Sequence, residues 1–507
     1  MTAGKSNLKK YDDIVVGSGI SGLTMGLILA LNGRKVLILE KSPTIGGSMS
    51  RFYRAGIPFD TGFHFTGGLQ KGGILDDILA VLGIGDLIQP VFLAEDRANQ
   101  FISECEGKVY DIPYGTERIK DKLKGYFPGE SGAIERYFDK VRRVCEQTPS
   151  MNLRTLDALH NHLDEDFISL EEVLTGLTQD PVLKALLCGF AMCYGVKPRE
   201  ISFADHSRMC IGLYESVARV KGGGGAFINA FKTRFMDCDV EIRCGTCIAE
   251  MADISDKKVG RFILTDGEEV SADDCIFTIH PKEIMKVLPE KCLSGAFRDR
   301  VSAFEPSTGF FSVFAALGPG DDDPDFDSSI ITLVPDNDIN KLMDDANEGD
   351  SALVLIRSIE REGGKTHKVI STCEPSAPGQ VAEWKDSKVG RRPQAYRDYK
   401  QKKVEHTIER IFAAFPEYKG RLKAYDSASV LTFRDYLNNY DGSAYGIKQK
   451  MGQYNLFGKL PIRNLYAAGQ SSLLPGIIGA MMSSFIVGRS IIKEEQYYSF
   501  IRRNLCS

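Results

Sequence analysis

Six residues near the amino terminus constrain the fold of this chain more than any other feature. An apolar run at residues 14–16, typical of a buried strand, leads directly into the turn 17–22, which carries three glycines. An apolar stretch at 23–31 follows and ends at an Asn-Gly pair, as helices commonly do. Residues 34–40 form a second apolar run, and its last residue is Glu40. The order strand, glycine turn, helix and strand with a terminal acid predicts a parallel βαβ unit.

This unit has the sequence fingerprint of a dinucleotide-binding fold. Gly17 permits the tight turn, Gly19 lets the backbone approach a diphosphate, and Gly22 lets the helix pack on the strand. The helix amino terminus presents free N–H groups to the diphosphate, and Glu40 accepts hydrogen bonds from the adenosine ribose. The expected binding residues of this unit are Gly17, Ser18, Gly19, Ile20, Ser21, Gly22 and Glu40.

A second glycine pair, Gly46-Gly47, follows the second strand closely. Flavoproteins of the glutathione-reductase and amine-oxidase type carry such a pair, because an extended FAD needs a second close approach of the backbone. Lys41 lies where it reaches the adenosine side, and Ser48 completes the turn. We therefore expect FAD, with contacts from Lys41, Gly46, Gly47 and Ser48.

The other end of the chain predicts the second half of a cofactor site. Residues 465–468 read as a short strand that ends at Gly469, and a helix begins at Pro475-Gly476 and continues to about residue 492. Such a helix can direct its first N–H groups at the flavin N1/O2 edge, which becomes negative on reduction. A membrane span is disfavoured by the interrupting polar residues and proline, and a plain core helix does not explain the strand–glycine–helix order. The expected contacts are Gly469, Gly476, Ile478, Gly479 and Ala480.

Together, the two ends resemble the phytoene desaturase, carotenoid isomerase and retinol saturase family of FAD-dependent oxidoreductases, and the resemblance covers most of the chain. Residues 59–68 are similar to the family's Asp-x-Gly-x-His segment in its retinol-saturase form. Residues 127–138, 221–227 and 443–446 resemble further family segments. The resemblance implies that Gly62, Phe63 and His64 lie beside the flavin, and that the backbone of Ile248 contacts adenine. Two departures are Ser48, where many relatives have Arg, and residues 320–390, which match no family segment.

His64 is the candidate catalytic residue. Strand alternation would place it on the side opposite Phe63 and Phe65, where it can face the reaction. A purely structural histidine is an equally open alternative. For His206 we expect a core or capping role. Cys244 and Cys247 have no second pair or histidine at ligand spacing, so no metal site is expected.

The resemblance implies an α/β fold with two discontinuous domains. A Rossmann-like FAD-binding domain of the glutathione-reductase/amine-oxidase type comprises residues 1–85, 215–300 and 425–507, and an α+β substrate-binding domain comprises 86–214 and 301–424. In the first we expect a strand at 240–243 paired with one at 246–251, and a hairpin of 261–265 with 269–272. In the second we expect a strand at 310–317, a surface helix at 393–415, and a solvated acidic loop at 321–327.

Composition narrows the partners. Lys plus Arg total 63 against 68 for Asp plus Glu, a net charge of −5, so the basic footprint of a nucleic-acid-binding protein is missing. The 12 scattered cysteines indicate reduced thiols, and the first ten residues contain no apolar core of a secretory signal, so we expect a cytoplasmic protein. The apolar run at 183–194 is either core or a wall that admits a lipid, which leaves peripheral membrane contact open.

The resemblance implies saturation or desaturation of C–C/C=C bonds in a lipophilic, isoprenoid or polyene-like substrate, and the form of the His64 segment favours saturation. Only one dinucleotide fingerprint occurs, so the electron donor or acceptor is NAD(P)H as a transient visitor, a quinone or a redox protein. Two alternatives are a redox-neutral cis–trans isomerase that uses reduced FAD, and a non-catalytic prenyl-binding protein of the same fold, as in Rab GDP-dissociation inhibitors.

Overall fold

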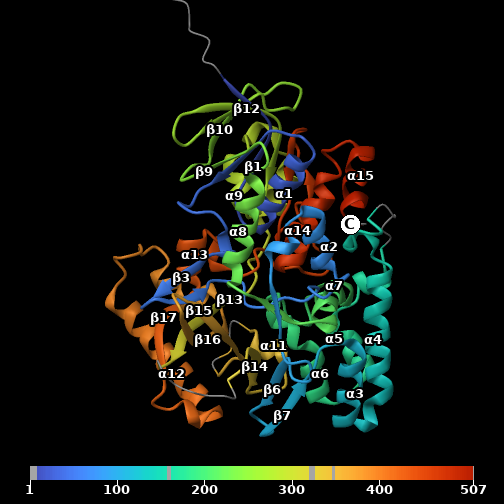
Figure 1. Cartoon of the computed structure of the whole chain (residues 1–507), viewed down its shortest axis with the longest axis vertical. Helices are drawn as coiled ribbons and strands as arrows, with labels where there is room; N and C mark the ends of the chain where they lie inside the picture. The colour runs from blue at the N-terminus through green and yellow to red at the C-terminus, as the bar shows by residue number, and fades with distance from the viewer. Residues whose placement is uncertain (1–7, 157–161, 319–325, 345–346, 348, 506–507) are drawn as a thin grey trace, which may run out of the picture.

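The computed structural model describes residues 8–156, 162–318, 326–344, 347 and 349–505. Most of the acidic loop expected at 321–327 lies outside these residues. Two large sheets organise the described chain: an eight-stranded sheet in the upper part of Figure 1 and a seven-stranded sheet in the lower part.

The eight-stranded sheet is mostly parallel and contains the predicted βαβ unit. Its strand order is β10-β11-β12-β1-β2-β9, with β19 beside β12 and β18 beside β19. The pairs β12–β1, β1–β2, β2–β9 and β12–β19 are parallel. Its strands are β1 (Lys9–Val16), β2 (Val36–Glu40), β9 (Val240–Cys244), β10 (Ile248–Ala252), β11 (Arg261–Leu264), β12 (Glu269–Phe277), β18 (Gly458–Lys459) and β19 (Leu465–Ala467).

Side-chain alternation along these strands builds two cores. Val15 and Ile38, which are paired across β1 and β2, face one side and pack against helices. Their neighbours Val16 and Leu39 face the other side, in a core that also contains residues of β10, β11 and α9. The helices of this part are α1 (Ile20–Leu31), α2 (Ile74–Leu82), α8 (Gly223–Phe235), α9 (Pro281–Val287), α10 (Gly295–Ser302), α14 (Gly476–Gly488) and α15 (Glu494–Leu505).

One strand pairing that we expected is wrong. β9 does not pair with the strand that follows it; it pairs in parallel with β2, from Val36↔Val240 to Glu40↔Cys244. β10 pairs instead with β11, antiparallel, beginning at Ile248↔Leu264. β9 occupies the edge of the sheet beside β2, and the short link at residues 245–247 leads from it to β10 at the other end of the strand order. The expected β11–β12 hairpin is present.

The seven-stranded sheet has the order β17-β13-β16-β15-β14-β6-β7 and is antiparallel except for β14–β6. Residues Ile408, Ile411 and Phe412 of α12 (Gln394–Ala414) pack in one of its cores, and Phe59 packs in another against Phe314. The strand and the helix predicted at 310–317 and 393–415 are both present. The strands are β6 (Asn99–Ser103), β7 (Lys108–Ile112), β13 (Gly309–Leu317), β14 (Ser329–Val334), β15 (Leu353–Glu362), β16 (Lys365–Ser376) and β17 (Leu422–Ala428).

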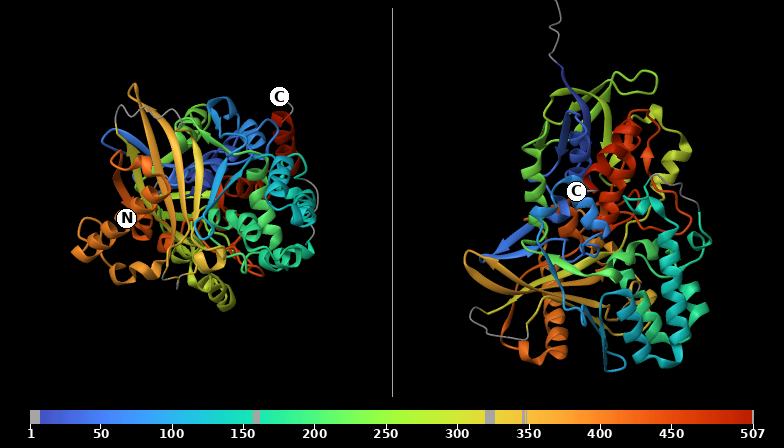
Figure 2. Two further views of the ribbon diagram at one scale, coloured as in Figure 1. Left: turned by 90° about the horizontal axis from the view of Figure 1, so that it is seen from below. Right: turned by 45° about the vertical axis from the view of Figure 1, so that its right-hand side comes forward.

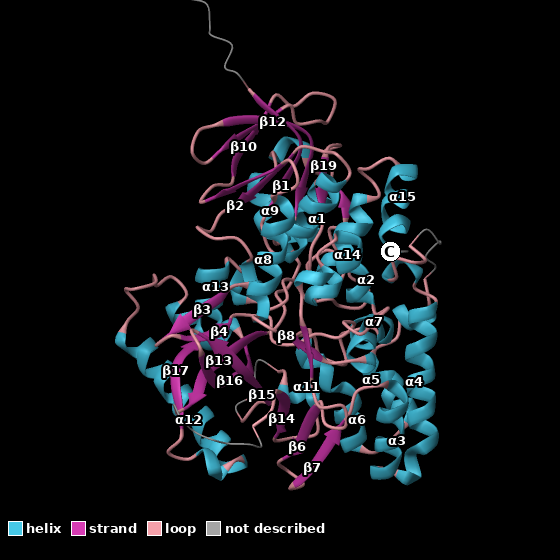
Figure 3. Ribbon diagram, viewed as in Figure 1, coloured by secondary structure: helices cyan, strands magenta, loops and turns pink. Residues whose placement is uncertain are grey.

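A group of helices lies beside this sheet, on the right of the lower part in Figure 3, and both views in Figure 2 keep it beside the strands. His206 is fully buried there, and its ring nitrogens lie 2.7 Å from the hydroxyl oxygens of Tyr137 and Tyr194, so the core role expected for His206 is confirmed. Most of the apolar run at 183–194 is buried in the same core. The helices are α3 (Thr116–Tyr126), α4 (Ser131–Glu146), α5 (Leu170–Leu177), α6 (Pro181–Cys188) and α7 (Phe203–Glu215).

Four short strands and two short helices complete the described strands and α-helices. They are β3 (Arg51–Arg54), β4 (Ile57–Asp60), β5 (Pro90–Phe92), β8 (Ala218–Val220), α11 (Ile339–Leu342) and α13 (Val430–Leu437). β17 crosses the boundary drawn between residues 424 and 425, and the division into two domains stays a prediction. Among the described residues, no helix has both the length and the apolar character needed to cross a membrane.

Candidate active site

A single cavity of about 1460 Å³ connects the two sheets. One end is lined by the glycine turns at the carboxyl ends of β1 and β2, and the other by residues of β13, β15 and β16. Of the residues that the sequence predicted to hold a cofactor, all except Gly22 and Gly469 line this cavity. Gly22 and Gly469 instead pack against other parts of the protein beneath the cavity.

Two glycines of the turn at residues 17–22 have different roles: Gly22 packs against the protein, and Gly19 faces the cavity. Gly17 has φ +99°, a left-handed conformation that favours glycine. A Cβ atom on Gly22 would overlap the carbonyl oxygen of Gly17, so only glycine lets α1 start this close to the turn. A Cβ on Gly19 would meet no protein atom within 4 Å. Gly19 is also the N-cap of α1 and supplies no side-chain cap, which leaves the first N–H groups of α1 available at the cavity.

Glu40 holds the turn in shape. Its Oε2 accepts hydrogen bonds from the backbone N–H of Ser18 at 2.9 Å and from the Ser18 hydroxyl at 2.6 Å. Its Oε1 accepts one from the backbone N–H of Ser42 at 2.7 Å. A carboxylate has about four acceptor positions, so capacity for a further donor remains. The contact of Glu40 with a ribose stays a prediction.

The second glycine pair packs directly on the first turn. The backbone N–H of Gly46 donates to the carbonyl oxygen of Ser18 at 3.0 Å. A Cβ on Gly47 would lie 3.4 Å from the Cα of Gly19, so the two turns are in contact. Lys41 is exposed where it lines the cavity, and Ser48 is half-buried against Gly62. The two turns therefore form one continuous backbone surface.

The carboxyl-terminal segment meets this surface through two serines. The hydroxyls of Ser21 in α1 and Ser484 in α14 lie 2.8 Å apart, and the Ser484 hydroxyl also donates to the Ser21 carbonyl oxygen at 2.9 Å. Gly469 donates its N–H to the Ser483 hydroxyl at 2.7 Å. Helix α14 begins at Gly476, as expected from the sequence, and its N-cap Pro475 supplies no side-chain cap. Segments more than 460 positions apart thus lie side by side.

At the adenosine end, Ile248 begins β10 and lines the cavity together with Cys247. The link before β10 is tied to β2, because the N–H of Thr246 donates to the carbonyl oxygen of Glu40 at 3.1 Å. Ile248 therefore lies next to the end of β2 that carries the acid. Its backbone contact with adenine stays a prediction.

His64 lies in irregular backbone and not in a strand. β4 ends at Asp60, so the alternation that we expected for residues 63–65 is wrong, and Phe63, His64 and Phe65 all line the cavity. No hydrogen bond to the imidazole ring of His64 occurs among the described residues. Burial, and secondarily the positive charge of Arg219, lower the pKa of His64 to about 3. At neutral pH its ring is therefore uncharged.

Sequence reasoning missed a buried group of two arginines and two carboxylates behind His64. Asp60 lies 3.0 Å from Arg51 and 3.3 Å from Arg219, and Glu360 lies 2.6 Å and 3.0 Å from the same two arginines. All four side chains are at most 10% exposed. Burial raises the pKa of Asp60, although both arginines oppose that change. No local pattern could reveal the group, since 141 positions separate Arg219 from Glu360.

The far end of the cavity is largely apolar. Tyr445, in the segment 443–446, supplies a polar group to this end. The apolar residues lining this end come from both the helical group and the seven-stranded sheet. They include Phe190, Met192, Met209, Ile211, Phe310, Phe314, Val354 and Ile356.

Comparisons with known proteins agree with this architecture. Residues 15–79 match a family model described as an NAD(P)-binding Rossmann-like domain. An oxidoreductase from Methanosarcina mazei superposes with a TM-score of 0.66 at 15% identity, covering 94% of this chain and 98% of that one. Putrescine oxidase bound to putrescine superposes with a TM-score of 0.63 at 13% identity, covering 95% and 98%.

Similarity in sequence extends over nearly the whole chain. All-trans-retinol 13,14-reductase from Danio rerio is 27% identical over 95% of this chain and 86% of its own length. The Homo sapiens protein of that name is 26% identical over 96% and 87%. Prolycopene isomerase 1 from an Oncidium hybrid cultivar is 31% identical, but over only 31% of this chain and 26% of its own.

The fold combines a Rossmann-like nucleotide-binding domain with the architecture of the amine oxidases, and the sequence similarity to the reductases identifies the class as an oxidoreductase. Within that class, the chain is similar along nearly its whole length to the all-trans-retinol 13,14-reductases.

Proposed function

We propose that this protein binds FAD and saturates a carbon–carbon double bond of a lipophilic isoprenoid polyene. The observation that carries this proposal is the single cavity, which joins a backbone surface suited to a dinucleotide to an apolar space between the sheets. Such a cavity brings a water-poor substrate to one end of an extended cofactor.

The residues around the glycine turns fit FAD. The open space at Gly19 and the uncapped start of α1 suit a diphosphate, whose charge the helix dipole favours. The start of α14 suits the flavin end, and the segment at Ile248 suits adenine. When bound, FAD supplies hydride transfer at its ring nitrogen. The chain itself positions the substrate and excludes water.

His64 is the residue that we propose acts on the substrate beside the flavin. It lines the cavity, and its ring forms no hydrogen bond with the described residues. A neutral imidazole has one donor and one acceptor nitrogen, so it can hold or pass a proton without bringing a charge into the apolar space.

Two further observations support our proposals for the direction of the reaction and the source of electrons. The reductases from Danio rerio and Homo sapiens match this chain along its length, which favours saturation over desaturation and over isomerisation. The seven-stranded sheet is almost wholly antiparallel, so in the described residues it offers no second dinucleotide fold. We propose that NAD(P)H, a quinone or a redox protein delivers electrons transiently from outside.

An absorption spectrum of the purified protein tests the cofactor, and we expect the two bands of a bound flavin. The photoreduced protein is then mixed with all-trans-retinol without oxygen, and the products are weighed by mass spectrometry. A mass gain of two hydrogens with reoxidation of the flavin supports saturation. An unchanged mass with a changed double-bond geometry would indicate an isomerase, and a colourless protein that still binds polyenes would indicate a carrier.

A further inference from the structure

The hydroxyl of Tyr445 is a polar group that faces the cavity without a partner. The side chain is largely buried and lines the cavity near Phe310, whose ring centroid lies 6.1 Å from that of Tyr445 in an edge-on arrangement. The hydroxyl forms no hydrogen bond with any described residue. Its oxygen atom is not fully buried. It is therefore free to bond to a molecule in the cavity.

The backbone around Tyr445 is held on three sides. Its own N–H donates to the Ser307 hydroxyl at 2.9 Å, and the N–H of Ser307 donates to the Gly446 carbonyl oxygen at 2.8 Å. The next segment is tied in as well, because the N–H of Thr308 donates to the carbonyl oxygen of Gly195 at 3.1 Å. A Cβ on Gly195 would lie 3.2 Å from the Tyr445 ring, so the ring packs closely on this glycine.

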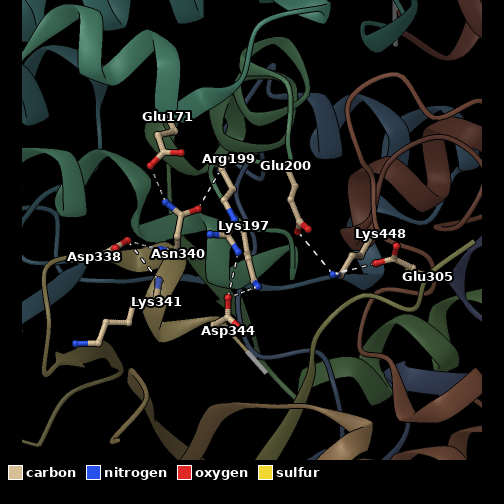
Figure 4. Close-up of polar contacts among 10 residues, drawn as sticks. All are labelled: Glu171, Lys197, Arg199, Glu200, Glu305, Asp338, Asn340, Lys341, Asp344 and Lys448. Carbon is tan, nitrogen blue, oxygen red and sulfur yellow. Dashed lines mark hydrogen bonds and ion pairs between the residues drawn. The ribbon is translucent and has the colours of Figure 1, made fainter. Parts of the chain in front are cut away.

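Ion pairs also hold the segments that contain Gly195 and Tyr445. Lys448, three residues after Tyr445, pairs with Glu305 and Glu200 (Figure 4), at 3.4 Å and 3.7 Å respectively. Lys197 and Arg199, on the segment of Gly195, pair with Asp344 at 2.8 Å and 3.1 Å (Figure 4). The backbone that carries the phenol is thus held in place before a ligand binds, which reduces the entropy lost on binding.

The backbone next to Tyr445 also contacts the segment that leads to α14. Gly446 has φ +74°, and a Cβ there would overlap the hydroxyl of Ser471, in the segment that leads to α14. Toward the substrate end, its neighbours are the thiols of Cys193 and Cys373. Burial raises the pKa of Tyr445 well above its usual value, so the phenol keeps its proton and acts as a donor.

We propose that the Tyr445 hydroxyl donates a hydrogen bond to an oxygen atom of the substrate and selects polyenes that carry a hydroxyl or carbonyl group over polyene hydrocarbons. This inference rests on the proposed function and specifies its substrate class. A hydrocarbon would displace water from the phenol and leave it unpaired, and sites built to bond a substrate hydroxyl reject analogues that lack it.

Equilibrium titration of the flavin-loaded protein tests this inference without catalysis. All-trans-retinol, its methyl ether and the hydrocarbon lacking the oxygen are added separately, and the change in flavin absorption reports binding. We expect the hydrocarbon to bind at least tenfold more weakly than retinol. The ether keeps the acceptor oxygen, so it should bind within about threefold of retinol. Equal affinity of the unaltered protein for retinol and hydrocarbon would overturn the inference.

Tyr445→Phe removes only the hydroxyl and should bring the two affinities within about threefold, mainly by weakening retinol binding. Tyr436→Phe is the matched control, since Tyr436 also lines the cavity but is 65% exposed, and its preference should equal that of the unaltered protein. A full preference in Tyr445→Phe would contradict the inference. Failure of the unaltered protein to bind flavin or either polyene would contradict the proposed function itself, and the inference with it. Should Tyr445→Phe not fold, the three-ligand comparison on the unaltered protein decides.

Discussion

Arg219 donates a hydrogen bond from Nη1 to the backbone carbonyl oxygen of His64 at 2.8 Å, while its Nη2 lies 3.0 Å from a carboxylate oxygen of Glu360. His64 borders the cavity, and Glu360 belongs to β15 of the seven-stranded sheet. One buried guanidinium thus connects the loop at the proposed reaction site with the sheet that forms the far wall.

Arg219→Met should destabilise the protein by about 3–5 kcal/mol, because removing one member of a buried ion pair leaves carboxylates without compensation. Here Asp60 and Glu360 would share Arg51 alone. Arg219→Lys keeps the positive charge but not the two-pronged geometry of the guanidinium, so this variant should lose less stability than Arg219→Met. Thermal unfolding followed by circular dichroism measures both variants. The matched control is Arg54→Met, whose pair with Asp426 is exposed and should contribute less than about 1 kcal/mol. Equal changes at Arg219 and Arg54 would contradict this assignment.

Gly19→Ala and Gly22→Ala should have opposite consequences. The methyl group at Gly19 meets no protein atom, so the apoprotein should keep its stability within about 1 kcal/mol while FAD affinity falls at least tenfold. The methyl group at Gly22 overlaps the Gly17 carbonyl, so this variant should lose stability even without cofactor. Unfolding of the apoproteins and flavin titrations separate the two effects. Unchanged flavin binding in Gly19→Ala would reject the proposed diphosphate position.

Glu40→Gln should weaken FAD binding at least tenfold. The amide replaces one carboxylate oxygen with a donor, which would then face the N–H donor of either Ser18 or Ser42. The turn would lose its shape although the side chain keeps its size. Glu241→Gln on the adjacent strand β9 is the control, because Glu241 pairs with Lys9 and Arg243 away from the turns. Flavin titration should distinguish the two variants, and similar affinities would argue against a role for Glu40.

Acid should destabilise the protein through its buried histidines. The pKa values of His64, His206 and His280 are lowered to about 3, mainly by burial. The unfolded chain takes up these protons near pH 6.5, so the free energy of unfolding falls as pH drops from about 6.5 toward 3. His64→Gln removes one such group and should make this fall shallower by on the order of 1 kcal/mol per pH unit. Urea unfolding at several pH values measures it. An identical slope in the variant would mean that His64 is protonated in the native state.

Local patterns allowed much of the nucleotide end to be predicted. Residues 14–40 form the expected strand, turn, helix and strand, since periodicity and glycine spacing act over a few positions. The same holds for the start of α14 at Gly476, although the helix ends at Gly488, before the expected residue 492. The sequence allows the apolar run at 183–194 to be either part of the core or a wall that admits a lipid. The run serves as both, because Leu183 lies in the core and Cys193 lines the cavity.

Other features were beyond local reasoning. β9 was assigned to the wrong neighbour because the choice between β2 and β10 depends on which sheet edge is free. His64 was expected on a regular strand, but β4 stops at Asp60, which turns inward to Arg51 and Arg219. A sequence shows neither event, since the pairing of β9 with β2 and the contact of Asp60 with Arg219 each join residues more than a hundred positions apart.

The sequence alone determined the class of cofactor surface, because the approach of a backbone to a diphosphate depends on glycines and a helix start that are neighbours in the chain. Only the tertiary structure decided what surrounds that surface: the Tyr445 hydroxyl in the cavity, the guanidinium of Arg219 behind His64, and the Ser21–Ser484 contact. Such contacts arise from the packing of distant segments, where burial and mutual hydrogen bonding select the partners and no short-range periodicity records the outcome.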